Sequence, residues 1–159
     1  MSVRLCINQS SLRRTDKGTV YGQVWFETEG AAFPARDWSD LAPAFIRSWI
    51  EALVNLATGS SNAESASFMD GPYSVEISVR QTGRLDMLFL RNENGRDVVK
   101  HSTHADLGTT LQNGMRAGEQ VLHEYRARGW TDRDEVAIRE TVLQGPFATL
   151  RGRKPGNQG

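Results

Sequence analysis

The sequence has little of what builds disulfide frameworks, membrane spans or strongly charged surfaces. Its 159 residues include one cysteine, Cys6, which excludes an internal disulfide and a cysteine-rich zinc site. Apolar runs such as Leu88-Phe89-Leu90 are far shorter than the roughly 20 residues that a membrane span needs. Nineteen basic residues balance nineteen acidic ones, so no net charge attracts nucleic acid or an anionic membrane. Because the N-terminus also lacks the apolar core of a signal peptide, we predict a soluble cytoplasmic protein.

Motifs that carry catalysis are also missing. The sequence has no Gly-x-Ser-x-Gly elbow, no phosphate-binding glycine loop and no dinucleotide-binding fingerprint. Cys6 has no base supplied by its neighbours, so an inert thiol is the expected state. His101 and His104 lack further ligands at metal-binding spacing and are expected to be solvated residues of a loop, while His123 is expected on the flank of a helix. We therefore predict a protein that is not an enzyme and needs neither metal nor cofactor.

Two segments resemble nucleic-acid-binding features but do not support that function. Residues 125–130 join two predicted helices, as the turn of a helix-turn-helix does. The second helix begins Asp132-Arg133-Asp134-Glu135, and its acidic residues would repel phosphate. We therefore predict no nucleic-acid partner.

Alternating and helical patterns divide the chain into secondary-structure elements. Alternation of apolar and polar residues predicts strands at residues 3–9, 20–27, 73–79, 85–89 and 97–100. A further short strand is expected around Ala66 and Phe68, ahead of a turn at residues 69–72. Asn94-Gly95 is typical of the turn of a tight hairpin. Helical spacing of apolar residues predicts helices at residues 41–56, 107–125 and 132–144. Asp37 or Ser39 is expected to cap the first helix, Gly129 to end the second, and a capping box at residues 131–134 to start the third.

These elements predict an α+β fold. We expect a mostly antiparallel sheet of about five to six strands, with the long helix and two C-terminal helices packed on it. Residues 1–150 are expected to form a single domain, and residues 151–159 a disordered basic tail.

Two strings of aromatic and acidic residues stand out, namely Phe33-Pro34-x3-Trp38-x-Asp40 and Phe68-Met69-Asp70-Gly71-Pro72-Tyr73. Their aromatic side chains are expected to pack around the entry of the first helix and around a turn. Their carboxylates leave two interpretations open, because an acid at a loop either caps a helix or belongs to a partner surface.

At these strings the sequence resembles a family of small bacterial proteins from polymorphic toxin loci that are regarded as immunity proteins. The resemblance covers about residues 20–145 and rests on both strings, on the helix that contains Trp49, and on Gly129-Trp130 between the last two helices. It implies a protein that neutralises a cognate toxin in the cytoplasm of the producing bacterium. Such an inhibitor is expected to occlude its toxin without catalysis, in a 1:1 complex.

The charge of the predicted domain suggests where such a partner binds. Without the three cations of the tail, residues 1–150 carry a net charge of −3. Acidic side chains favour encounter with the basic clefts of toxins that act on nucleic acids or nucleotides. The predicted partner-binding residues are Glu27, Glu29, Asp37, Asp40, Asp70 and Tyr73.

A second function remains open, that of a small-ligand-binding or regulatory module. In that interpretation an apolar ligand lies in a pocket between the sheet and the first helix. The residues expected to line this pocket are Trp25, Trp49, Phe68 and Phe89.

Overall fold

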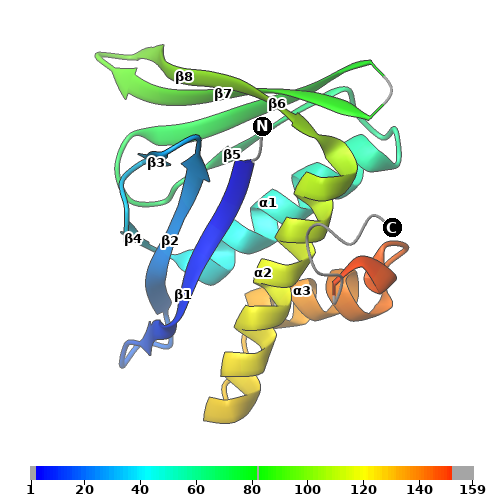
Figure 1. The fold of residues 1–159 in the computed structure, drawn as a ribbon. Helices are drawn as coiled ribbons and strands as arrows, with labels where there is room; N and C mark the ends of the chain where they lie inside the picture. The colour runs from blue at the N-terminus through cyan, green and yellow to red at the C-terminus, as the bar shows by residue number, and fades with distance from the viewer. Residues whose placement is uncertain (1–2, 82, 152–159) are drawn as a thin grey trace.

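The computed structural model describes residues 3–81 and 83–151, which form an α+β fold with two antiparallel sheets and three α-helices (Figure 1). Sheet A contains β1 (Val3–Arg14), β2 (Val20–Thr28), β3 (Ala31–Phe33) and β4 (Ser39–Asp40). Sheet B contains β5 (Ala63–Ser67), β6 (Tyr73–Gln81), β7 (Arg84–Glu93) and β8 (Arg96–Asp106). The helices are α1 (Ala42–Ala57), α2 (Leu107–Arg128), α3 (Arg133–Gln144) and a short 3-10 turn, η1 (Ala148–Leu150).

The predicted α+β class and the antiparallel pairing are confirmed, but the single sheet of five to six strands is wrong. The eight strands form two sheets of four. Helix α1 follows β4 directly, and β5 then pairs with β6 and with no strand of sheet A. The strands missing from the prediction are β3 and β4, which at three and two residues are too short for alternation to be recognised. The strand expected around Ala66 and Phe68 is present as β5.

Sheet A begins with a strand that is longer than predicted. β1 extends to Arg14, and its pairing with β2 is irregular between Asn8 and Arg13. The outer edge of β1 faces α2, where the Asn113 side chain meets the backbone of Leu5. The Leu5 N–H donates to Asn113 Oδ1 at 2.7 Å, and Asn113 Nδ2 donates to the Leu5 carbonyl at 3.4 Å. One side-chain amide thus takes the place of a strand partner along this part of the edge.

Sheet B contains the histidine pair that was expected in a loop. Both His101 and His104 lie in β8, so that expectation is wrong. The predicted Asn94-Gly95 turn between β7 and β8 is confirmed, and both residues have positive φ angles. His104 Nδ1 lies 2.7 Å from Asp86 Oδ1 on β7, and His101 Nε2 lies 2.9 Å from Thr28 Oγ1. The second contact connects the two sheets.

The hydrophobic core lies around α1, which packs against β2 and β5 as well as the other two helices (Figure 1). Phe26 of β2 lies at its centre, fully buried. Its ring makes edge contacts with four aromatic rings, those of Phe45, Trp49, Phe68 and Phe89. Sheet A, sheet B and α1 therefore share one aromatic cluster.

The structure confirms two of the three predicted helix boundaries. Gly129 ends α2 with a φ of 67°, as predicted. α3 also begins where predicted, but its cap is the Asp132 side chain, which accepts the Glu135 N–H at 2.8 Å, one residue after the predicted box at 131–134. The predicted cap of α1 is wrong, because Ser39 lies in β4 and Leu41 is the capping residue without a side-chain hydrogen bond. Of the predicted tail, residues 152–159 lie outside the described residues.

Candidate functional site

Asp40 connects the two loops that carry Asp37 and Asp70, two of the predicted partner-binding residues. Its carboxylate is completely buried. Oδ1 accepts the backbone N–H groups of Leu41 at 2.7 Å and Met69 at 3.0 Å. Oδ2 accepts the indole N–H of Trp38 and the backbone N–H of Asp70, both at 3.0 Å. With no accessible surface, this carboxylate cannot contact a partner, so Asp40 is a structural residue of the site.

We call residues 34–38 and 69–72 the loop pair. They are the β3–β4 and β5–β6 connections, which lie on the same side of the molecule (Figure 1). The Trp38 and Tyr73 rings meet edge to face with centroids 5.3 Å apart. At Gly71, which has a φ of 81°, a Cβ atom would lie 3.2 Å from both rings. Only glycine fits this conformation and spacing without strain.

The loop pair presents the acids that the sequence pointed to. Asp37 and Asp70 are exposed on its two segments, and Tyr73 is half-buried at the start of β6. Met69 between them is 52% exposed, which is high for a large apolar side chain. The structure therefore brings Asp37, Asp70 and Tyr73 to one surface and adds Met69, which sequence reasoning missed.

Glu27 also belongs to the predicted set, but its charge is compensated. Its carboxylate lies 2.8 Å from Arg4 Nη2 and 3.2 Å from Arg36 Nη1. The Trp25 indole N–H donates to the same carboxylate at 3.3 Å. The hydrogen bond from Arg4 and that from Trp25 lower the pKa of Glu27. Since Arg36 belongs to the loop pair, this ion-pair group joins β2 to that surface.

These ion pairs predict a pH-dependent contribution of Glu27 to stability. A carboxyl group whose pKa is lowered on folding stabilises the fold at pH values above its ordinary, unfolded pKa. This contribution is lost as the pH falls through the lower, folded pKa. The difference in unfolding free energy between the native protein and Glu27→Gln should therefore be largest at neutral pH and shrink in acid. Urea unfolding at a series of pH values measures it.

Glu29→Gln is the matched control, because Glu29 is exposed and has no ion pair within the described residues. Its difference from the native protein should stay nearly constant with pH. An equally flat profile for Glu27→Gln would show that the arginine pairs contribute nothing to stability.

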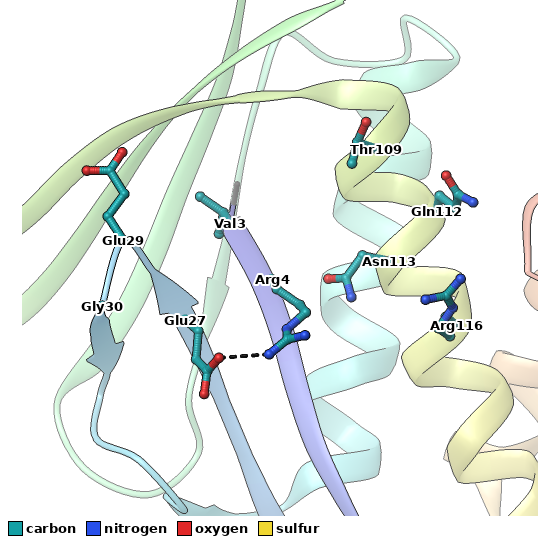
Figure 2. A pocket seen from close by; sticks show the side chains of 9 residues that line it. All are labelled: Val3, Arg4, Glu27, Glu29, Gly30, Thr109, Gln112, Asn113 and Arg116. Atoms are coloured by element: carbon teal, nitrogen blue, oxygen red, sulfur yellow. Dashed lines mark hydrogen bonds and ion pairs between the residues drawn. The ribbon is translucent and has the colours of Figure 1, made fainter. Parts of the chain in front are cut away.

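A cleft of about 540 Å³ adjoins Glu27 and Glu29, between the ends of β1 and β2 and the first turns of α2 (Figure 2). Arg4 and its partner Glu27 lie on the sheet side, with Glu29 and Gly30 at the β2–β3 turn. The lining from α2 is polar and consists of Thr109, Gln112, Asn113 and Arg116. With both charge signs and amide groups present, the cleft suits polar contacts with a partner.

The space that the alternative function assigned to a ligand is filled by side chains. Trp49 and Phe89 are fully buried and Phe68 is 3% exposed, and the Phe68 ring stacks on that of Phe45 at 4.0 Å. Trp25 is buried outside this cluster, where its indole contacts Glu27. None of these four residues lines the cleft beside Glu27.

Neither a reactive thiol nor a metal-binding cluster is found in the described ranges. The Cys6 thiol is half-buried, and this burial raises its pKa, which disfavours the reactive thiolate. Among residues 3–81 and 83–151, no three His, Cys, Asp or Glu side chains are grouped to hold a metal ion. Over the same ranges, no helix has the length and apolar character needed to cross a membrane.

Two features of the site could not be recognised from single residues. The Arg4–Glu27 pair depends on the β1–β2 register, which places these residues opposite each other. The burial of Asp40 depends on backbone N–H groups 29 and 30 residues later in the chain. The sequence offers one weak signal for each feature. Alternation places Arg4 and Glu27 on the outward faces of their strands, and acids occur in both aromatic strings.

Comparison with known proteins identifies no relative of this chain. No family model, no curated protein and no solved structure matches the chain.

Proposed function

We propose that this chain is an immunity protein that binds a cognate protein toxin in a 1:1 complex and neutralises it by occlusion, without catalysis, in the cytoplasm of the producing bacterium. The loop pair is the observation that supports this function best. Its two segments are fixed to each other through the buried Asp40 carboxylate and the Trp38–Tyr73 contact. A surface that is ordered before binding loses less conformational entropy on association, which favours a tight complex.

The chemistry of the loop pair fits a basic partner. Asp37 and Asp70 provide two exposed carboxylates, with exposed Met69 as an apolar contact. Methionine is enriched at the centres of interfaces, while acids of this kind increase the rate of encounter with a positively charged cleft. Glu29 extends the same charge along the β2–β3 turn, next to the Glu27–Arg36 ion pair. The toxin face that fits is a basic active-site cleft, as in enzymes that act on nucleic acids or nucleotides.

Neutralising Asp37 and Asp70 tests this surface. Asparagine is the replacement of choice because Asp37 has a φ of 58°, a conformation that asparagine also adopts readily. The Asp37→Asn/Asp70→Asn variant should associate with the toxin about tenfold more slowly at low salt, with a smaller difference at high salt. Its melting temperature should remain close to that of the native protein, because both side chains are exposed. Stopped-flow association and thermal unfolding measure the two effects.

The matched control is Glu51→Gln/Glu140→Gln, which removes the same charge from exposed positions on α1 and α3. Its association rate should change little. Equal slowing in both variants would show that only net charge matters and that the loop pair is not the interface. The proposal predicts a toxin-domain gene next to the gene for this chain, and its product is the toxin for these measurements. Failure of the chain to protect cells from that product would end the immunity proposal itself.

A further inference from the structure

A second cleft, separate from the one beside Glu27, lies where the two sheets meet. It has a volume of about 360 Å³ and is lined by residues of both sheets. Thr28 and Phe33 come from sheet A, while Tyr73, Arg91, Lys100 and His101 come from sheet B. The volume lies within the range of small-molecule sites in proteins.

The side chains from β7 and β8 give this cleft an excess of positive charge. Arg91 and Lys100 share one carboxylate, that of Glu93, which is not among the lining residues. Lys100 Nζ lies 2.8 Å from Glu93 Oε1, whereas Arg91 Nη1 is 3.7 Å from the same oxygen. One carboxylate cannot neutralise two cations, so a ligand that carries negative charge is favoured here.

The backbone of β8 contributes to this arrangement. On β7, Phe89 pairs with His101 and the next residue, Leu90, pairs with Val99. Lys100 of β8 therefore has no partner on β7 and is the extra residue of a bulge. Such a β-bulge redirects side chains and is frequent beside functional sites. His101 is fixed by its contact with Thr28 at 2.9 Å, which also holds the two sheets together at the cleft.

Aromatic rings form the remaining wall. The Tyr73 and Phe33 rings meet edge to face with centroids 5.5 Å apart, and the Arg91 guanidinium lies 5.9 Å from the Tyr73 centroid. No hydrogen bond joins the Tyr73 hydroxyl to another group of the described residues. A ring or other flat apolar group would therefore find an aromatic surface next to the cations and a free hydroxyl donor.

We infer that this cleft binds a small ligand in which a carboxylate or phosphate group is joined to a flat apolar body. The anionic group lies against Arg91 and Lys100, where charge-assisted hydrogen bonds form, and the apolar body lies against Tyr73 and Phe33. The proposal does not depend on a toxin partner, so it and the immunity function can fail separately.

Titration of the full chain with phenyl phosphate, benzoate and inorganic phosphate tests the site. Backbone amide NMR should show saturable shifts around Arg91 and residues 99–101 with phenyl phosphate or benzoate, and weaker binding of inorganic phosphate, which lacks the apolar body. A ligand held between the sheets should also raise the melting temperature, by about 3–5 °C at a tenfold excess over its Kd. The preference between phenyl phosphate and benzoate identifies the anionic group.

Charge-neutral variants distinguish the proposed site from nonspecific anion binding. Arg91→Gln/Lys100→Gln should weaken binding at least about tenfold, since each charge-assisted hydrogen bond is stronger than a neutral one. The control Arg13→Gln/Lys17→Gln removes the same charge near the β1–β2 turn and should leave the Kd unchanged. The proposal is overturned if no probe saturates at concentrations up to about 10 mM, well above a Kd of about 1 mM. Equal weakening in both variants would overturn it as well.

Discussion

Replacing Asp40 with asparagine is expected to destabilise the protein by about 3–5 kcal/mol. In the native protein each oxygen of the Asp40 carboxylate accepts two N–H groups. Asparagine replaces one of these oxygens with an NH2 group, which cannot accept, so two N–H donors lose their acceptor. Buried donors left without an acceptor cost about 1–3 kcal/mol each, and hydrogen bonds to a charged acceptor are among the stronger ones. Urea unfolding monitored by tryptophan fluorescence measures the loss. In the same variant, the amide hydrogens of Met69 and Asp70 should exchange with solvent faster than in the native protein.

Asp37→Asn is the matched control for this substitution. It makes the same chemical change three residues earlier, at an exposed position that has no hydrogen bond to lose within the described residues. Its effect on the unfolding free energy should stay within about 0.5 kcal/mol. If Asp40→Asn is as mild as this control, then the carboxylate does not hold the loop pair together.

Phe26→Ala should have a comparable effect, about 3–5 kcal/mol, for a different reason. The ring is fully buried, with its centroid 4.9 Å from that of Trp49 and 5.5 Å from that of Phe89. Because these neighbours belong to α1 and to a strand of the other sheet, the walls of the cavity lie on separate elements that cannot easily move inward together. Chemical denaturation measures the change, and the slope of the transition should be preserved if the fold remains intact.

Tyr21→Ala on the same strand is the control for loss of an aromatic ring, since Tyr21 is 42% exposed. It should destabilise the protein far less than Phe26→Ala. Similar losses in the two variants would mean that strand propensity, and not the shared aromatic cluster, accounts for the effect.

The features that could be predicted from the sequence are those whose cause is local. The Asn94-Gly95 turn, the start of α3 and the glycine that ends α2 each depend on the conformational preferences of a few neighbouring residues. The division into two sheets could not be predicted in this way. It depends on which strands pair after α1 intervenes, and alternation shows that a strand has two faces without showing its partner.

The same distinction applies to the candidate site. Asp37 and Asp70 were predicted at exposed loop positions, and the structure places them there. Asp40, two residues after Trp38, has a similar sequence context but is buried, because the β5–β6 loop folds over it. Within the described part of the chain, Glu27 forms ion pairs and Glu29 does not, and this difference also depends on residues elsewhere in the chain. The arginine partners of Glu27 come from β1 and from the β3–β4 loop. Contacts between distant parts of the chain, and not residue type, therefore decide which carboxylates are bound within the protein and which are exposed to a partner.

The amide of Asn113 that covers the β1 edge has a consequence for the order of folding during synthesis. Leu5 and Asn113 are separated by 108 residues, so β1 emerges from the ribosome long before its cover exists. Until α2 is made, the backbone N–H and carbonyl of Leu5 remain open to strands of neighbouring nascent chains. Completion of α2 therefore ends the period in which this edge can pair with the wrong partner.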